Sequence, residues 1–241
     1  MADCIYIFER YESKYLLDAR AYSTLMRGMR EHITPEQYGR YTIYNLYFDT
    51  PNFRLVRQSL DKPIYKEKLR LRSYTLPKAD SEVFVELKKK YDGVVYKRRV
   101  QMSYKQAYEY LMLGKNPDPD AQILREIDWF KSFYPMRPAV NLSYAREAFA
   151  GKEDDALRIT FDSDILWRST NVDLSKGAFG EQLLEPGMRL MELKTPGAIP
   201  LWLCRLLDAA QIYPTSFSKY GSSYLRMLQS EEKIKDVFTC A

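Results

Sequence analysis

Short segments in which apolar and polar residues alternate recur along the whole chain. Successive side chains of an extended strand point to opposite faces, so such alternation is typical of a strand with one buried face. On this basis we predict strands at residues 6–16, 41–48, 64–74, 82–90, 94–102, 139–149, 157–161 and 188–193. The chain is therefore expected to be rich in β-structure.

Helical periodicity fills most of the intervals between these segments, and it predicts helices at residues 19–33, 52–60, 104–113, 121–133, 200–210 and 219–229. Ser103 and Ser218 precede two of these helices, and serine is favoured at the N-cap because its hydroxyl accepts from a backbone N–H. Asp92-Gly93 is a typical hairpin turn, so residues 82–102 are predicted to form one antiparallel pair.

The stretches with the weakest patterns, at residues 114–120, 151–155 and 171–186, do not resemble long flexible linkers. Strand patterns continue on both sides of each stretch. We therefore predict a single α+β domain over residues 1–241 rather than two domains. No internal repeat or low-complexity tract is found in the sequence.

Charged residues occupy one face of several predicted strands. In the segment Lys66–Arg72 every second side chain is a cation, whereas Leu69 and Leu71 point to the other face. Cations about 6.6 Å apart repel by roughly 0.6 kcal/mol in water and by about 2.5 kcal/mol at an effective dielectric constant of 20. An exposed edge strand tolerates this repulsion. A face that lines a confined space needs a polyanion to relieve it.

The pattern Glu-x-Lys occurs on three predicted strands, as Glu12-Ser13-Lys14, Glu86-Leu87-Lys88 and Glu192-Leu193-Lys194. A half-buried antiparallel sheet with its charges in water would produce the same alternation. A closed barrel with many cations and a few carboxylates inside would instead bind a phosphate chain together with its divalent cation. Carboxylate oxygens suit Mg²⁺ or Mn²⁺, and Lys and Arg neutralise phosphate oxygens.

Composition narrows the classes of partner and chemistry. With 241 residues, of which 46% are hydrophobic, the chain can bury a sizeable core. A net charge of +5 suggests an anionic partner, but the basic residues are not clustered as in a nucleic-acid-binding tail, so no nucleic acid is expected. Cys4, Cys204 and Cys240 lack metal-type spacing and are predicted to be reduced thiols.

Familiar catalytic motifs are absent from the sequence. There is no glycine-rich phosphate loop, because Gly114-Lys115 is followed by Asn116-Pro117. His32 is the single histidine and is predicted to be structural, so triads that need a histidine have no good candidate. The N-terminus lacks a signal-peptide pattern, and no apolar run is long enough to span a membrane. We expect a cytoplasmic protein, with a membrane-protein partner left open and the oligomeric state undetermined.

Seven motifs occur in the order seen in one known family. They are Phe8-Glu9-Arg10-Tyr11-Glu12-Ser13-Lys14-Tyr15, Tyr47-Phe48-Asp49-Thr50, Lys68-Leu69-Arg70-Leu71-Arg72, Val85-Glu86-Leu87-Lys88, Tyr144-x-Arg146, Met191-Glu192-Leu193-Lys194 and Phe217-Ser218-Lys219-Tyr220. The chain thus resembles the catalytic domain of the vacuolar transporter chaperone (VTC) complex and its bacterial relatives, which belong to the triphosphate tunnel metalloenzymes. The resemblance runs from about residue 8 to residue 225.

This resemblance implies a closed antiparallel β-barrel with helices packed outside, and a polyphosphate polymerase that moves the terminal phosphate of ATP onto a growing polyphosphate chain. It also implies site residues. The triphosphate would be held by Lys14, Arg70, Arg72, Lys88 and Arg146, the path extended by Lys97, Lys194, Ser218 and Lys219, and the Mn²⁺ or Mg²⁺ ligated by Glu192 with Glu12 and Glu86; Arg10 and Lys68 are further lumen candidates. No side-chain nucleophile is needed, because positioning and charge neutralisation dominate phosphoryl transfer.

One departure from the family pattern bears on the reaction. Hydrolytic tunnel enzymes open with Glu-x-Glu-x-Lys, whereas this chain has Arg10-x-Glu12-x-Lys14. Arginine in place of the first carboxylate should weaken a water-activating site and strengthen phosphate binding, which favours the polymerase. A triphosphatase of the same fold is the first alternative, because Glu12 is retained. A non-catalytic polyphosphate-binding subunit is the second, and the retained cations argue against it.

Overall fold

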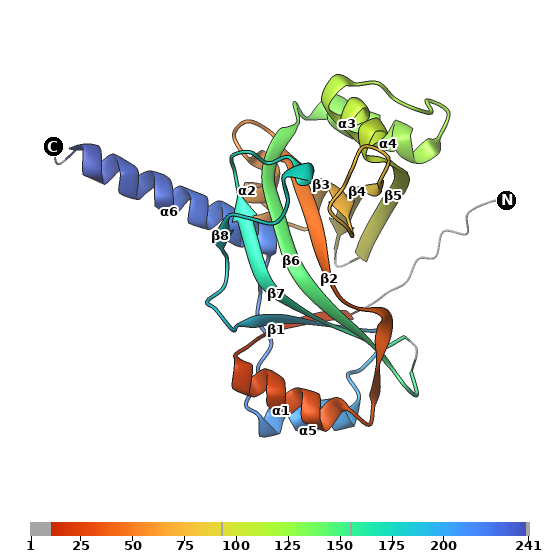
Figure 1. The fold of residues 1–241 in the computed structure, drawn as a ribbon, viewed down its shortest axis with the longest axis vertical. Helices are drawn as coiled ribbons and strands as arrows, with labels where there is room; N and C mark the ends of the chain where they lie inside the picture. The colour runs from red at the N-terminus through yellow and green to blue at the C-terminus, as the bar shows by residue number, and fades with distance from the viewer. Residues whose placement is uncertain (1–10, 93, 155, 240–241) are drawn as a thin grey trace. The chain divides into compact units, whose positions relative to one another are not determined.

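Strands and helices of the computed structural model are described for residues 11–92, 94–154 and 156–239 (Figure 1). Nine strands are hydrogen-bonded in the order β1 (Tyr11–Leu17), β9 (Arg189–Thr195), β7 (Arg158–Arg168), β6 (Arg137–Gly151), β2 (Ile33–Asp49), β3 (Tyr65–Ser73), β4 (Glu82–Tyr91) and β5 (Val94–Ser103), with β8 (Glu181–Gln182) paired to β7. The helices are α1 (Ala19–Met29), α2 (Arg54–Leu60), α3 (Tyr104–Leu113), α4 (Gln122–Phe133), α5 (Leu201–Ala209) and α6 (Lys219–Thr239), with a 3₁₀ turn, η1 (Leu174–Lys176). The predicted α+β class with an antiparallel sheet is confirmed.

The chain divides into two compact units. Unit 1 comprises residues 1–42, 144–165 and 184–217, and unit 2 comprises residues 43–143, 166–183 and 218–241. Three long strands, β2, β6 and β7, contribute residues to both units. Within the described ranges, hydrogen bonds do not join the end strands β1 and β5, so closure of the sheet into the predicted barrel stays a prediction. That residues 1–241 form a single domain stays a prediction.

Unit 1 is built around the apolar face of β1, β7 and β9. The helices α1 and α5 lie side by side (Figure 1), and their apolar side chains pack with those of the strands. Tyr15, Phe161 and Met191 point into this core and are at most 3% exposed. The alternate residues of the same strands carry the charges, so the predicted division of polar and apolar faces holds here.

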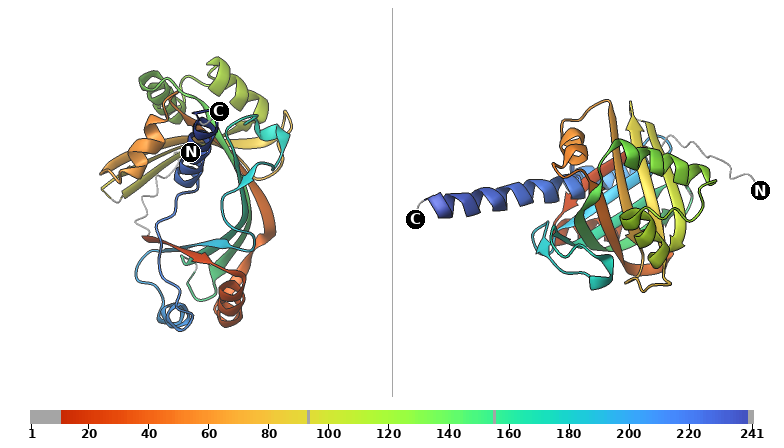
Figure 2. Two further views of the ribbon diagram at one scale, coloured as in Figure 1. Left: turned by 90° about the vertical axis from the view of Figure 1, so that its left-hand side faces the viewer. Right: turned by 90° about the horizontal axis from the view of Figure 1, so that it is seen from above.

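Unit 2 uses the same principle on β3, β4 and β5. Leu69, Leu71, Val85 and Leu87 belong to the unit 2 core and are at most 1% exposed. The helix α3 packs against β4 and β5, and α4 packs against β5 (Figure 2). Ser103 forms the N-terminal capping box of α3, as its position predicted.

A buried carboxylate joins two of the family motifs within unit 2. Asp49 is fully buried and accepts hydrogen bonds from the backbone N–H groups of Leu55 at 2.9 Å and Val56 at 3.0 Å. The hydroxyl of Tyr220 donates to the same carboxylate at 2.8 Å. Asp49 therefore anchors the first turn of α2 and holds it to α6. The hydroxyl of Ser218 accepts from Gly221 N at 3.1 Å, which confirms its predicted capping role.

Several boundaries differ from the predicted ones, and local breakers hide part of the strand pattern in β2 and β7. The predicted helix at residues 19–33 ends at Met29, and β2 begins at Ile33, well before the predicted start at residue 41. Pro35 and Gly39 lie in this early part of β2, and Gly39 has a φ of 56°. The strand β7 continues past the predicted end at residue 161 to Arg168, although Asp164 has a φ of 51°.

The weakly patterned stretch after β7 is ordered by one side chain. The buried guanidinium of Arg168 donates to the carbonyl oxygens of Asn171, Asp173, Gly177 and Phe179 at 2.7–3.0 Å. These bonds fix the segment that contains η1 and β8. Hydrogen bonds from one side chain to the carbonyl groups of a loop leave no periodic signal in the sequence.

The remaining expectations concern the hairpin, the histidine, the cysteines and the membrane. The pairing of Tyr91 with Val94 confirms the predicted β4–β5 hairpin. His32 stacks on Trp202 with ring centroids 4.2 Å apart. Cys204 is a free thiol, whereas Cys4 and Cys240 lie outside the described residues. None of the described helices has both the length and the apolar character that crossing a bilayer requires.

Candidate functional site

Strand register gathers cations on one surface of unit 2, opposite the buried apolar face. Pairing places Lys68 opposite Lys88 and Lys88 opposite Lys97, and it places Arg70 opposite Glu86 and Glu86 opposite Arg99. We call this surface of β3, β4 and β5 the cationic face; it comprises Lys66, Lys68, Arg70, Arg72, Lys88, Lys90, Lys97 and Arg99, with Glu86 among them.

The lysine row on this face is electrostatically costly. Lys68, Lys88 and Lys97 lie directly across from one another on neighbouring strands, about 5 Å apart in the backbone. Like charges in that arrangement destabilise a sheet. A bound polyanion would convert this cost into attraction, which is the chemistry expected of a phosphate site.

Glu86 is the carboxylate at the centre of the cationic face and is only 1% exposed. Its Oε2 lies 2.7 Å from the guanidinium of Arg70 and 3.9 Å from Arg72 Nε. Its Oε1 lies 2.8 Å from Lys97 Nζ and 3.3 Å from Arg99 Nε. Glu86 therefore serves as a shared counter-ion that holds four cations in place.

The pKa values of Glu86 and Lys97 reflect this packing. Burial raises the pKa of Glu86, but the charges of Arg70, Arg72 and Lys97 outweigh it and hold the pKa well below its ordinary value. Burial lowers the pKa of Lys97, Glu86 opposes that shift, and the nearby Arg70 and Arg72 add to it. At neutral pH the cluster thus contains one ionised carboxylate among several cations.

Buried neighbours on β2 orient the two arginines of β3. Arg72 Nε donates to Asn45 Oδ1 at 2.9 Å, and Asn45 is fully buried. Arg70 Nη1 donates to the hydroxyl of Tyr47 at 3.2 Å. Burial raises the pKa of Tyr47, but Arg70 and the neighbouring cations on β3 reverse this and lower it to about 8. The ring of Tyr47 stacks on Tyr220 at 4.6 Å, which links this network to Asp49.

Arg99 was missed among the predicted site residues. Its guanidinium carbon lies 3.6 Å from the ring centroid of Phe84, and its Nη2 donates to the Tyr74 hydroxyl at 2.9 Å. A signal was present in the sequence, because Arg99 lies two residues after Lys97 on the same strand face. The hairpin turn also sets the register that places Arg99 opposite Glu86.

Unit 1 carries a second group of charges on β1, β6 and β9, which we call the mixed cluster: Glu12, Lys14, Arg146, Glu192 and Lys194. Lys14 Nζ lies 3.4 Å from Glu12 Oε1 and 3.9 Å from Glu192 Oε1, and it donates to the carbonyl of Phe217 at 2.9 Å. Lys194 Nζ lies 4.0 Å from Glu12 Oε2. Antiparallel pairing explains the group, because Glu12 is opposite Lys194 and Lys14 is opposite Glu192.

Arg146 connects the mixed cluster to a carboxylate on β7. Its Nη2 lies 3.5 Å from Glu192 Oε2, and its Nε and Nη2 donate to the two oxygens of Asp162 at 2.6 and 2.7 Å. Burial lowers the pKa of Arg146, but Tyr144, Asp162 and Glu192 raise it well above its ordinary value. Arg146 therefore stays charged at any relevant pH.

The predicted site residues that the structure describes fall into two groups, one in each unit. Unit 2 holds Lys68, Arg70, Arg72, Glu86, Lys88 and Lys97 on the cationic face, with Ser218 and Lys219 at the start of α6. Unit 1 holds Glu12, Lys14, Arg146, Glu192 and Lys194 in the mixed cluster. Arg10 lies outside the described residues.

The acidic residues differ in their suitability as metal ligands. Across residues 11–92, 94–154 and 156–239, no group of three or more His, Cys, Asp or Glu side chains is arranged to hold a metal ion. Glu12 and Glu192 share Lys14 as a neighbour, and each has a second cation within 4.0 Å, Lys194 beside Glu12 and Arg146 beside Glu192. Mg²⁺ commonly takes one or two carboxylates and completes its shell with water and substrate phosphates. Glu12 and Glu192 fit that requirement, because their cations lie 3.4–4.0 Å away, whereas Glu86 holds Arg70 and Lys97 at 2.7 and 2.8 Å.

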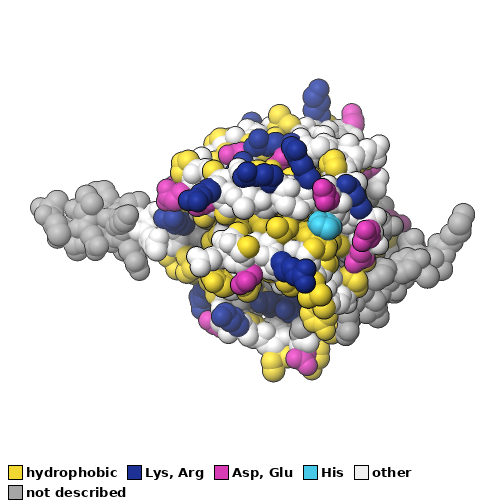
Figure 3. All heavy atoms as spheres, turned by 90° about the horizontal axis from the view of Figure 1, so that it is seen from below, with side chains coloured by type: hydrophobic (Ala, Val, Ile, Leu, Met, Phe, Trp, Pro, Cys, Tyr) yellow, Lys and Arg dark blue, Asp and Glu magenta, His cyan; other side chains and the backbone are white. Residues whose placement is uncertain are grey.

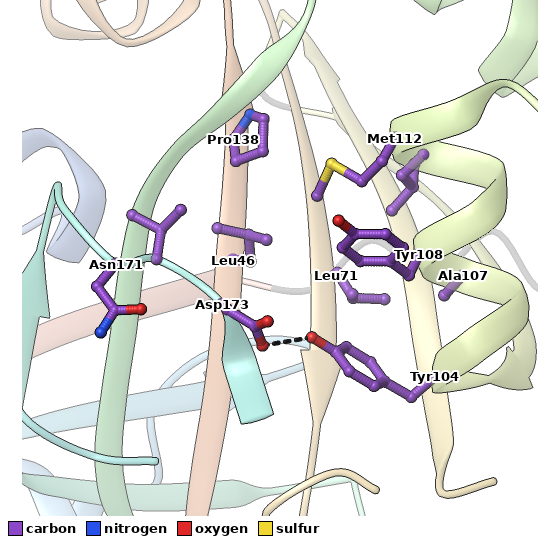
Figure 4. Close-up of a pocket in the computed structure, with 11 residues that line it drawn as sticks. Leu46, Leu71, Tyr104, Ala107, Tyr108, Met112, Pro138, Asn171 and Asp173 are labelled. Atoms are coloured by element: carbon purple, nitrogen blue, oxygen red, sulfur yellow. Dashed lines mark hydrogen bonds between the residues drawn. The ribbon is translucent and has the colours of Figure 1, made fainter. Parts of the chain in front are cut away.

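Unit 2 also contains an apolar cavity of about 360 Å³, whose lining side chains are drawn in Figure 4. Leu46 and Leu71 line it from the sheet, Ala107 and Met112 line it from α3, and Tyr104 donates to Asp173 at 2.7 Å at its edge. Leu71 points to the face opposite that of Arg70 and Arg72. This cavity is therefore distinct from the cationic face.

Figure 3 shows the distribution of charge on one face of the molecule. On the face of the molecule drawn in Figure 3, basic and acidic side chains are mixed with apolar ones. The register of β3, β4 and β5 accounts for the cations that lie opposite one another on the cationic face.

Comparisons with known proteins agree with these observations. The family model described as the VTC domain matches residues 9–228. A candidate adenylate cyclase from Bacillus halodurans is 14% identical with a TM-score of 0.54, and the match covers 87% of this chain and 95% of that protein. A candidate adenylyl cyclase from Hippeastrum, described as having a dominant triphosphatase activity, is 17% identical with a TM-score of 0.52, covering 87% and 92%.

At these identities the two structures show a shared fold and nothing further. Among proteins with curated functions, none matches the chain at a significant level. The matched range of the family model includes six of the seven motifs in full and most of the first.

Proposed function

Because the chain belongs to the VTC domain family, as its ordered motifs predicted, we propose that it is a polyphosphate polymerase. In the proposed reaction a terminal oxygen of polyphosphate attacks the γ-phosphorus of ATP. The bond from that phosphorus to the bridging oxygen breaks, and ADP leaves with the electron pair. The chain grows by one phosphate, and no side chain is modified.

The observation that carries this proposal is the cationic face of unit 2. Side chains from three neighbouring strands present lysine and arginine groups in register, around one buried carboxylate. A linear polyanion matches such a surface, since each phosphate adds negative charge along one direction. The proposal also retains the closure of the sheet into a tunnel, which the family resemblance implies.

In this proposal the arginines supply the charge stabilisation for transfer. Arg70 and Arg72 are fixed by Glu86, Tyr47 and Asn45, so they need little reorganisation when negative charge develops on the transferred group. Lys88 lies opposite both Lys68 and Lys97 and would hold neighbouring phosphates. In unit 1, Lys14 and Arg146 would contact the triphosphate, and Lys194 would extend the binding surface. Ser218 and Lys219 keep their proposed substrate-binding role.

The proposed reaction includes a divalent metal ion held by carboxylate oxygens. Glu192 and Glu12 would hold Mn²⁺ or Mg²⁺, and the bound ion would neutralise phosphate charge. Glu86, which the resemblance implied as a further ligand, does not fit this role, because its oxygens lie within 2.8 Å of Arg70 and Lys97. A metal ion placed there would have to displace strongly bound cations.

A triphosphatase is the second candidate, and a specific observation favours it. Glu12 is retained beside Lys14, and a carboxylate in that position could orient a water molecule. The Hippeastrum protein of the same fold is described as mainly a triphosphatase. The two reactions differ only in whether polyphosphate or water attacks the phosphorus.

One experiment separates the candidates. Purified protein is incubated with ATP and Mn²⁺, and ADP, free phosphate and long polyphosphate are measured in the same tube. Polymer with matching ADP supports the polymerase, whereas free phosphate without polymer supports the triphosphatase. Absence of both products, together with retained polyphosphate binding, would leave a non-catalytic binding protein.

A further inference from the structure

A buried carboxylate on β7 has no role in the function proposed above. Asp162 is fully buried, and its Oδ1 and Oδ2 accept from Nε and Nη2 of Arg146 at 2.6 and 2.7 Å. Two parallel charge-assisted bonds of this kind fix the plane of a guanidinium as well as its position. Arg146 is therefore held in one orientation before any ligand arrives.

Neighbouring groups complete this restraint. Arg146 Nη2 lies 3.5 Å from Glu192 Oε2, and the guanidinium carbon lies 5.3 Å from the ring centroid of Tyr144. The side chain of Arg146 is only 11% exposed. Its Nη1 group is not part of the bidentate pair with Asp162. An arginine restrained in this way loses less rotamer freedom when it binds a phosphate than an exposed arginine would.

Asp162 neutralises the buried guanidinium of Arg146, but its charge also acts on any ligand that binds there. The negative charge of Asp162 opposes the binding of any anion to Arg146, so it weakens the attraction that a phosphate site needs. Orientation of the guanidinium is the benefit that would offset this effect. Removal of the charge with the shape kept separates the two roles. A counter-ion alone predicts tighter phosphate binding with kcat unchanged, whereas an orienting role predicts a lower kcat.

We propose that Asp162 is a positioning residue that orients Arg146 toward the phosphoryl group being transferred. This inference rests on the proposed function. The fixed guanidinium then meets the charge that develops during transfer without having to reorient, which is the origin of most electrostatic catalysis. Asp162 itself contacts Arg146 and needs no contact with substrate.

The first test replaces the carboxylate by an amide of the same shape. In Asp162→Asn the amide NH₂ faces the donors of Arg146, so at least one of the two bonds is lost. We expect kcat to fall roughly ten- to a hundredfold, the range for a lost hydrogen bond to a charged group. The Kd for tripolyphosphate should not weaken, since an opposing charge has gone. Asp164→Asn is the matched control, because Asp164 is an exposed neighbour on β7 that pairs with Arg40.

A double variant shows whether Asp162 acts through Arg146. In an Arg146→Ala background, adding Asp162→Asn should cause no further loss of kcat. The double variant also controls for misfolding, because it leaves neither charge of the pair buried without its partner. An NMR spectrum of the arginine side chains gives an independent readout. The Arg146 Nε–H signal should exchange slowly with water in the wild type and quickly in Asp162→Asn.

The outcomes separate this inference from the function on which it rests. If the wild type turns over ATP and Asp162→Asn keeps its kcat within about twofold, Asp162 does not position Arg146 and the polymerase proposal is unaffected. A further kcat loss in the Arg146→Ala background would also overturn the inference. If the wild type neither binds tripolyphosphate nor turns over ATP, the proposed function fails and the inference fails with it.

Discussion

Replacing Glu86 by glutamine should destabilise unit 2 and at the same time improve its binding of phosphate chains. The substitution keeps the size of the side chain and removes the charge shared by four cations. Arg70 and Arg72 have side chains only 19% and 9% exposed, so they cannot regain full hydration. Lys97 and Arg99, at 42% and 35%, can turn toward water.

The magnitude follows from that difference in exposure. Removing one partner of a buried ion pair costs about 3–5 kcal/mol. Because two of the four cations can rehydrate, we expect the lower end, about 3 kcal/mol, for Glu86→Gln. For a chain of this length that loss lowers the Tm by about 6–12 °C. Glu82→Gln is the matched control, because Glu82 is an exposed residue four positions earlier on the same face of β4.

The pH dependence has a defined sign. The folded-state pKa of Glu86 lies below its ordinary value of 4.5, so its stabilising contribution is complete above about pH 4.5 and is lost as the pH falls toward the folded-state pKa. The difference in unfolding free energy between wild type and Glu86→Gln should therefore be constant near neutral pH and shrink in acid.

Thermal unfolding followed by circular dichroism, with and without tripolyphosphate and in EDTA, measures both effects. A phosphate chain should replace the missing charge, so the ligand should stabilise Glu86→Gln more than the wild type. Tenfold tighter binding corresponds to about 1.4 kcal/mol of extra stabilisation at saturating ligand. A loss of stability below about 1 kcal/mol, or weaker tripolyphosphate binding in the variant, would refute the counter-ion role of Glu86.

Three further predictions test the site. Arg70→Ala should abolish turnover and keep the fold, because three other cations still neutralise Glu86. Arg98→Ala is the control in the same ATP assay and should stay active, because Arg98 pairs with Glu126 of α4. Glu192→Gln should remove most of the activation by Mn²⁺ in a metal titration, and unchanged activation would place the metal elsewhere. The pKa of Tyr47 is about 8 in the folded protein, against an ordinary value of 10.0. The free energy of unfolding of the wild type should therefore rise between pH 8 and pH 10, and that of Tyr47→Phe should not. Chemical denaturation at several pH values measures this difference.

Alternation within each strand could be predicted from the sequence, because side-chain direction along a strand is a local property. The cations of β3 were assigned to one face and Leu69 and Leu71 to the buried face, as the structure has them. A two-residue turn predicted at Asp92-Gly93 fixes the register of β4 and β5. The position of Arg99 opposite Glu86 could therefore have been predicted from the sequence as well. The beginning of β2 was missed because Pro35 and Gly39 interrupt its pattern.

Long-range pairing was decided only by the tertiary structure. The strand β1 pairs with β9, almost at the other end of the chain, and no local pattern specifies that neighbour. This pairing brings Lys14 to Glu192, and the packing of β6 against β7 brings Arg146 to Asp162. Glu86 likewise had the same Glu-x-Lys pattern as Glu12 and Glu192, yet its burial among cations gives it a different role. Residue type and spacing determine which groups are available, whereas burial and partners across strands determine what each group can do.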